Sequence, residues 1–354
     1  MNILFVDQKS STPYDSAIMR REAVGGTEAS LVTVAEGLAA THRVAVVQLG
    51  RQQPVEFSPS LRYLPLHSPH PFGNQPADAV VILRRIRAIP AYRRRFPQAR
   101  IHVWLHNWQR PEVVLKRGIL ARNHCSLITV SDALLQDTDR LINGWPARLL
   151  VSCIGAGGRV PIRRIYNPVD IKPPAEPVNV DHDRLIFFST ANKGLKQVLE
   201  AFATVHAAFP TMRLEIAGST QAGLQKQVPD CTRRPGINFL GRIPRQELLA
   251  RVQTSLCVFY PQATHPETFG LVFAEANAVG TPVLAHDFGS AAEILQDPAQ
   301  LVNAHDHTAI LERIKQWRSG DRPQVGRRDE FRPRAVINQW RQLLEIDQPP
   351  ARKP

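Results

Sequence analysis

Two glutamates are the residues of this chain best suited by type and spacing to bind a polar ligand. Glu267 and Glu275 have seven residues between them, and a short helix is predicted from Leu271 to Val279 with Thr268 as its N-cap. Glu267 would precede this helix, where backbone amides have no partner. Glu275 would be the one acid among apolar or small residues, so it either faces solvent or awaits hydroxyl donors. Amides and two carboxylates suit an anion or sugar hydroxyls.

The stretch around these glutamates resembles the E-x7-E motif of retaining GT-B glycosyltransferases of the family 4 type. Pro-Glu-Thr-Phe-Gly precedes and Gly-Thr-Pro-Val follows, which makes the resemblance specific. It implies that the second glutamate, Glu275, binds the nucleotide ribose. It also implies that the donor sugar is held by Glu267 and the amides after it, at Thr268, Phe269, Gly270 and Leu271. The alternative is an N-terminal glutamate that favours the helix dipole and a second, solvated one.

Two further sites are expected in the first half of the chain. Gly25 and Gly26 open an amphipathic helix, and a glycine pair there lets the backbone approach a phosphate, although a plain tight turn would look the same. The family carries a glycine pair facing the donor diphosphate and the acceptor. His106 follows the strand Ile101–Leu105, where ligands of α/β sheets bind, and family members often use a histidine there on the donor sugar.

Departure of a nucleoside diphosphate requires a nearby cation. Lys193, before Gly194, matches the diphosphate-binding lysine of the family. The Gly-Arg that usually ends the preceding strand is absent and replaced by Phe188-Ser189, so Thr190 or Asn192 is expected to supply a substitute hydrogen bond. Leu240, Gly241 and Arg242 resemble the loop whose backbone holds the base.

Length and strand pattern indicate the domain organisation. The 354 residues favour two domains, and buried-type strands alternating with helices indicate an α/β fold. By resemblance these are two Rossmann-like domains facing an interdomain cleft. We expect an acceptor-side domain at 1–170, a nucleotide-sugar-binding domain at 171–330, and a helix near 331–345 that packs back onto the first domain. Residues 346–354 form an expected disordered tail.

The charge of the chain indicates an anionic partner. Its net charge is +13, and the segment from Arg84 to Arg122 carries ten arginines and one lysine against one acid. The Arg84–Arg95 part is either a solvated helix face or a surface for an anionic membrane or a phosphorylated acceptor. Nucleic acid is not expected, because aromatic residues are not interleaved. No apolar run reaches the ~20 residues of a membrane span, so we expect a cytoplasmic protein, peripheral on the inner face of the plasma membrane.

No cofactor or metal is expected. Asp181-His-Asp183 and Asp137-Thr-Asp139 match the letters of a D-x-D metal motif, but neither follows a strand at the carboxyl edge of a sheet. The sequence thus predicts retaining, metal-independent transfer of a sugar from a nucleotide sugar to a saccharide or lipid-linked acceptor, in cell-surface polysaccharide or lipopolysaccharide assembly. The alternatives are a nucleotide-sugar epimerase or hydrolase of the same fold, and a degenerate basic binding protein.

Overall fold

The computed structural model describes residues 1–22, 24–145, 147, 158–172, 176, 178–230 and 233–346. The chain divides into two compact units, which are described separately. The first unit contains Met1–Met19, Val24–Pro168 and Glu330–Pro354, and the second contains Arg20–Ala23 and Val169–Asp329. The prolines at 173, 174 and 177, expected to mark a linker, and the expected tail beyond residue 346 lie outside the described residues.

The first unit is built on an eight-stranded sheet with the order β3-β4-β2-β1-β6-β7-β8-β9. All neighbouring strands are parallel except the edge pair of β3 and β4. Every residue of the central strand β1 is buried, as expected where helices cover both faces of a parallel sheet. The strands are β1 (Asn2–Asp7), β2 (Arg43–Gln48), β3 (Val55–Ser58), β4 (Leu61–Pro65), β6 (Ala79–Leu83), β7 (Arg100–Leu105), β8 (Ser126–Thr129) and β9 (Ile162–Arg164), with a short β5 (Pro71–Asn74) outside this order.

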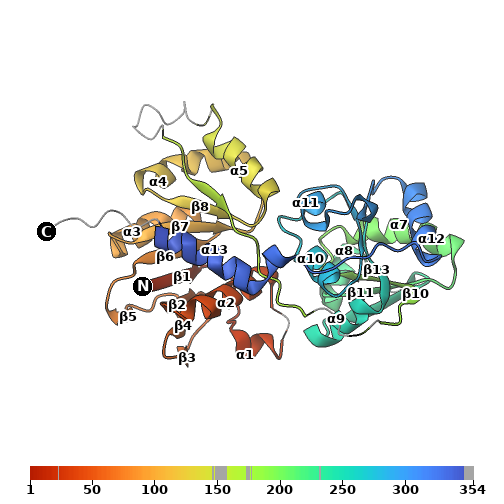
Figure 1. The fold of residues 1–354 in the computed structure, drawn as a ribbon, viewed down its shortest axis with the longest axis horizontal. Coiled ribbons are helices and arrows are strands. Elements are labelled where there is room, and N and C mark those ends of the chain that lie inside the picture. The colour runs from red at the N-terminus through yellow and green to blue at the C-terminus, as the bar shows by residue number, and fades with distance from the viewer. Residues whose placement is uncertain are drawn as a thin grey trace. The chain divides into compact units, whose positions relative to one another are not determined.

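The helices of the first unit include the C-terminal helix α13, which packs beside α2 (Figure 1). A side chain at Gly37 of α2 would bring its Cβ 2.1 Å from Ile337 of α13, so glycine allows this close approach. Trp340 of α13 makes edge contacts with Phe5 and Trp104 of the sheet. The helices are α1 (Ser16–Met19), α2 (Gly26–Ala39), η1 (Ile86–Ala88), α3 (Ile89–Arg95), η2 (Pro111–Lys116), α4 (Arg117–Arg122), α5 (Asp132–Asn143), η5 (Asp329–Phe331) and α13 (Pro333–Ile346).

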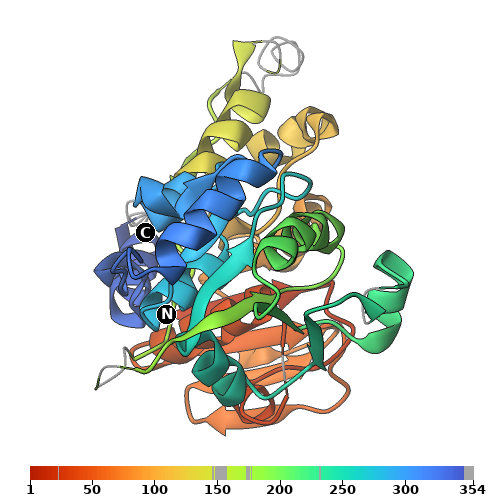
Figure 2. The ribbon, with the colours of Figure 1, turned by 90° about the vertical axis from the view of Figure 1, so that its right-hand side faces the viewer.

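The second unit is built on a six-stranded, fully parallel sheet with the order β12-β11-β10-β13-β14-β15. Figure 2 turns toward the viewer the side of this unit where the green α7 and the blue α12 lie, and these two helices contact each other. The strands are β10 (Asp181–Phe188), β11 (Arg213–Ala217), β12 (Ile237–Gly241), β13 (Ser255–Tyr260), β14 (Val283–His286) and β15 (Leu301–Val302). The helices are α7 (Leu195–Ala208), α8 (Gln221–Gln227), α9 (Arg245–Gln253), α10 (Leu271–Ala278), α11 (Ala291–Leu295), η4 (Pro298–Gln300) and α12 (His307–Arg318).

The two units thus form an α/β structure with two parallel sheets, as the sequence predicted. The neighbouring strands β10 and β13 of the second unit are followed by the loops that carry Lys193 and Glu267. Loops at the carboxyl ends of parallel strands meet at one edge of the sheet, which is where ligands of such folds bind.

Candidate functional site

Glu267 lies in the loop between β13 and α10, and groups from three segments fix it. Lys193 Nζ donates to its two carboxylate oxygens at 2.8 and 2.9 Å. The Tyr260 hydroxyl donates to Oε1 at 2.9 Å. The Glu267 backbone carbonyl accepts from the backbone N and the hydroxyl of Ser290, both at 3.1 Å. The residue is only 7% exposed, so this burial is compensated by a cation and a hydroxyl donor.

Lys193 is positioned by a tight junction between two loops. Gly194, the N-cap of α7, has a φ of +76°, a conformation that favours glycine. A Cβ at this position would lie 2.6 Å from side-chain atoms of Gln262, in the loop after β13. The backbone N of Lys193 donates to the carbonyl of the exposed Thr190 at 2.9 Å. Lys193 therefore reaches Glu267 from a loop packed against the loop that leads to it.

His265 is a further titratable group beside this pair. Gln262 fixes the backbone of His265 by accepting from its N–H and donating to its carbonyl, both at 2.8 Å. Burial and the positive charge of Lys193 lower the pKa of His265, while the carboxylate of Glu267 opposes this shift. The imidazole is therefore favoured in its neutral form next to Lys193.

Glu275 lies in α10 and forms an ion pair with Arg245. Arg245 Nη2, at the start of α9, donates to Glu275 Oε1 at 2.8 Å. The side chain of Glu275 is 12% exposed and that of Arg245 is 47% exposed. The structure therefore places Glu275 between the two alternatives of the sequence: it is largely buried, and a cation already holds one of its oxygens.

The helix α10 begins at Leu271 as predicted, but its N-cap differs from the prediction. Gly270 is the N-cap, with a φ of +76°, and no side chain caps the helix, so the predicted capping role of Thr268 is wrong. A Cβ at Gly270 would meet the ring of Phe273 at 2.4 Å, which excludes other residues from this turn. Phe269 is buried, and the first backbone bond of the helix is donated by Phe273. The amide of Leu271 thus precedes the hydrogen-bonded turns, where amides are free to meet a ligand.

Leu240, Gly241 and Arg242 lie at the carboxyl end of β12, the edge strand of the second sheet. Gly241 has a φ of +71°, and its carbonyl accepts from the backbone N of Gly218 at 2.9 Å. Arg242 is exposed. Within the described part of the chain, no hydrogen bond joins these residues to the two glutamates, but α9 begins three positions later and supplies Arg245.

The first unit gathers charged groups around the glycine pair and His106. The buried Asp7, which ends β1, and Glu28 in α2 both bind the Arg84 guanidinium, at 3.4 and 3.2 Å. A Cβ added at Gly25 would lie 2.2 Å from Oε2 of Glu28. Gly26 is the first residue of α2. Burial and the charge of Arg84 lower the pKa of His106 well below its usual value, so this ring is neutral at physiological pH.

The Arg84–Arg95 segment forms η1 and α3, but its arginines do not share one exposed face. Arg84 is in the charge cluster just described. Arg93 donates to the carbonyls of Pro97, Ala99 and Asn123, and Arg95 donates to those of Ser68 and Pro69. Among the described residues of this segment, the exposed arginines that make no such bond are Arg85, Arg87 and Arg94. A surface on this segment that binds a polyanion would consist mainly of these three arginines.

Sequence reasoning missed four residues of these sites: Asp7, Arg84 as a paired cation, Arg245 and Tyr260. Asp7 ends a buried strand, and Arg245 follows a proline at a helix start, so position alone gave some signal for both. Tyr260 ends a strand of apolar residues and looked like core. Its hydroxyl bond depends on the backbone path of the next seven residues, which no local pattern reveals.

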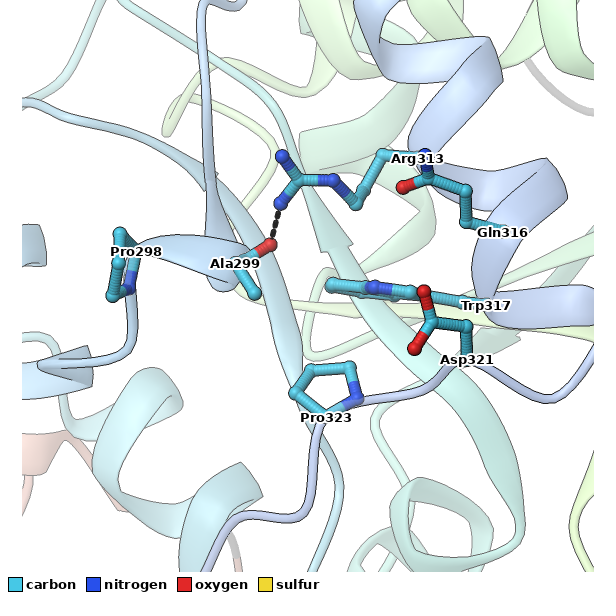
Figure 3. A pocket seen from close by; sticks show the side chains of 7 residues that line it. All are labelled: Pro298, Ala299, Arg313, Gln316, Trp317, Asp321 and Pro323. Atoms are coloured by element: carbon cyan, nitrogen blue, oxygen red, sulfur yellow. Dashed lines mark hydrogen bonds between the residues drawn. The ribbon is translucent and has the colours of Figure 1, made fainter.

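A shallow hollow of about 420 Å³ lies elsewhere on the second unit and contains none of the predicted site residues. Figure 3 shows Trp317 and Arg313 of α12 on one side, with Arg313 hydrogen-bonded to the carbonyl of Ala299. Within the described part of the chain, no cluster of three or more histidine, cysteine or acidic residues is suited to hold a metal ion. The described helices also include none that is long and apolar enough to cross a membrane.

Comparison with known proteins finds relatives of part of this chain. Residues 177–335 match the family model described as glycosyl transferases group 1. The chain is 29% identical over 171 residues to a D-inositol 3-phosphate glycosyltransferase of Corynebacterium urealyticum, covering 44% of this chain and 39% of the relative. It is 30% identical over 115 residues to a phosphatidyl-myo-inositol mannosyltransferase of Propionibacterium freudenreichii subsp. shermanii, covering 32% and 28%. The match thus spans well under half of these relatives.

The fold is similar over the whole chain to solved structures. An α,α-trehalose-phosphate synthase (UDP-forming) from Burkholderia xenovorans, in complex with glucose-6-phosphate, matches with a TM-score of 0.66 and 12% identity. This match covers 98% of the present chain and 100% of the other. The solved neighbours are glycosyltransferases of GT-B fold. Residues 177–335 therefore resemble the group 1 glycosyl transferases, and the chain has the GT-B fold.

Proposed function

We propose that this protein transfers a sugar from a nucleotide-sugar donor to a saccharide or lipid-linked acceptor, retaining the anomeric configuration and using no metal. The observation that carries the proposal is the contact of Lys193 Nζ with both oxygens of Glu267, made by loops that follow neighbouring strands. A cation for the leaving diphosphate and a carboxylate for sugar hydroxyls are thus within one hydrogen bond of each other. In a nucleotide sugar, the diphosphate and the sugar are likewise direct neighbours.

Each group has a role set by its charge. When the sugar leaves, negative charge grows on the diphosphate, and Lys193 supplies the opposing charge that a divalent cation supplies in other enzymes. Glu267 accepts hydrogen bonds from sugar hydroxyls and Glu275 from the ribose, while amides at the start of α10 face the ligand. By the family resemblance, His106, as a neutral imidazole, is assigned to the donor sugar, and the Gly25-Gly26 turn is assigned to the diphosphate and the acceptor. These contributions are positional and electrostatic.

Charge and the names of the relatives support a proposal for the acceptor and the place of action. The relatives named above act, by their names, on an inositol phosphate and on a phosphatidylinositol. With a net charge of +13 and exposed arginines at 85, 87 and 94, this chain suits an anionic surface. We place its reaction at the inner face of the plasma membrane, in the assembly of a cell-surface polysaccharide or lipopolysaccharide, without nucleic acid.

The test has two steps. A thermal-shift screen across UDP, GDP, ADP, TDP and CDP first identifies the nucleotide, because a ligand at 100 times its Kd stabilises by about 2.7 kcal/mol. The matching nucleotide sugars are then incubated with saccharide, phosphoinositide and polyprenyl-phosphate-linked acceptors, and the products are weighed by mass spectrometry. We expect a product heavier by one sugar. Nucleotide released without an acceptor product indicates a hydrolase or epimerase, and no nucleotide binding at all indicates a degenerate binding protein.

A further inference from the structure

Tyr260 is a core residue by sequence, yet the structure aims its hydroxyl at the proposed donor site. The residue is 1% exposed. Its ring stacks on Phe187 of β10 at 5.3 Å with an interplanar angle of 8°, and Phe273 of α10 meets it edge-on at 5.4 Å. These two contacts fix the ring between the strand that leads to Lys193 and the helix that follows Glu267. The position of the hydroxyl is therefore determined by packing.

The hydroxyl lies between Glu267 and Ser189. It donates to Glu267 Oε1 at 2.9 Å, since a carboxylate can only accept. A side-chain hydrogen bond with Ser189, the residue after β10, lowers the Tyr260 pKa. Burial and the charge of Glu267 outweigh that bond and raise the Tyr260 pKa well above 10. The phenol therefore stays protonated, and remains a donor to Glu267, at every physiological pH.

This bond matters because the other partner of Glu267 has a second task. Within the described residues, the Glu267 carboxylate accepts hydrogen bonds from Lys193 and Tyr260. A donor diphosphate would compete with the carboxylate for Lys193, whose side chain is 31% exposed. Once Lys193 turns to phosphate, Tyr260 would be left to hold the carboxylate. A short carboxylate side chain with one oxygen fixed presents the other to the sugar in a defined direction.

We propose that Tyr260 is a positioning residue that, supported by Ser189, orients Glu267 toward the donor sugar when Lys193 engages the diphosphate. The inference rests on the proposed function, since it takes Glu267 as the sugar-binding carboxylate. Tyr260 does not touch the ligand and acts through Glu267. It therefore governs how much the sugar adds to donor binding, and leaves nucleotide binding unchanged.

The test uses Tyr260→Phe, which keeps the ring contacts and removes one hydroxyl. Tyr63→Phe is the matched control, because Tyr63 is an equally buried phenol in the first unit. Calorimetric titration of the full-length proteins with the nucleoside diphosphate and with the matching nucleotide sugar gives the ratio of the two dissociation constants. Losing a hydrogen bond to a charged group costs about 10-fold or more, so in Tyr260→Phe this ratio should move about 10-fold against the sugar. Affinity for the nucleotide alone should stay within about twofold.

Two variants identify the route of the effect. Ser189→Ala should move the ratio in the same direction by a smaller amount. In a Glu267→Gln background, Tyr260→Phe should add nothing, because the two residues act as one unit. An unchanged ratio in Tyr260→Phe, an equal loss for nucleotide and nucleotide sugar, or full additivity with Glu267→Gln would each overturn the inference. Failure of the wild type to form an acceptor product would instead overturn the proposed transfer, because these titrations need no acceptor.

Discussion

The substitution Glu275→Gln tests whether the donor site still binds a nucleotide. The structure gives the expected size of its effect on stability and of its effect on nucleotide affinity. The substitution keeps the shape of the side chain and removes its charge. In the ligand-free protein it weakens one ion pair with Arg245, whose side chain is 47% exposed. Solvent screens such a pair, so the loss is worth at most about 1 kcal/mol. The melting temperature should therefore change by no more than a few degrees.

The expected effect on ligand binding is larger. A ribose hydroxyl bonded to a buried carboxylate contributes roughly 1.5–3 kcal/mol, so nucleotide affinity should fall by about 10-fold or more. Arg245→Gln is the matched control, because it breaks the same ion pair and leaves the carboxylate in place. The assay is calorimetric titration with the preferred nucleotide and with its 2′,3′-dideoxy analogue. Wild type and Arg245→Gln should both discriminate strongly between the two ligands, and Glu275→Gln hardly at all.

Equal discrimination by wild type and Glu275→Gln would refute the ribose assignment. A loss of the same size in Arg245→Gln and Glu275→Gln would refute it in another way. That result would show that the ion pair, and not a contact of Glu275 with the ligand, supports nucleotide binding.

Three further predictions concern charged groups. Lys193→Ala should lower kcat by ~10²-fold with little change in far-UV circular dichroism, since the cation acts on charge in the transition state; more than about a tenth of wild-type kcat would contradict this. Replacing Arg85, Arg87 and Arg94 together by glutamine should reduce sedimentation with anionic vesicles, most clearly at low salt; equal binding of wild type to neutral and anionic vesicles would leave only a solvated face. His106 has a folded-state pKa below its unfolded value near 6.5, so its contribution to stability is present above that pH and lost as the pH falls. Urea unfolding at pH 7.5 and 5.5 should therefore show a smaller pH-dependent loss for His106→Asn than for wild type, and identical losses would contradict the burial of a neutral ring.

The strands and the adjacency of the site loops could be predicted because they depend on short-range patterns. The apolar run Ile101–Leu105 lies inside a strand as expected. The rule that loops after parallel strands share one edge of the sheet then brings Lys193 and Glu267 together. Their contact distances could not be predicted, because they depend on the packing of Gly194 against Gln262.

The errors have local physical causes. Thr268 was predicted as the N-cap because threonine favours that position, but the chain makes a left-handed turn at Gly270 and this glycine is the N-cap, while the helix begins at Leu271 as predicted. Arg84 was grouped with its arginine neighbours by composition. Its positive φ of 62° instead turns it toward Asp7 and Glu28. Partners that are distant in sequence decide such cases, so no window of neighbouring residues reveals them.

The central claim is that a nucleotide sugar is bound and split at Lys193, Glu267 and Glu275, with its sugar passed to an acceptor. The most direct measurement follows the anomeric proton of the donor by NMR in the presence of the best acceptor and excess EDTA. We expect that the donor signal disappears, that an acceptor-linked signal of the same anomeric configuration grows at the same rate, and that Lys193→Ala slows both by ~10²-fold. A product of inverted configuration, a reaction that EDTA abolishes, or free sugar as the sole product would contradict it.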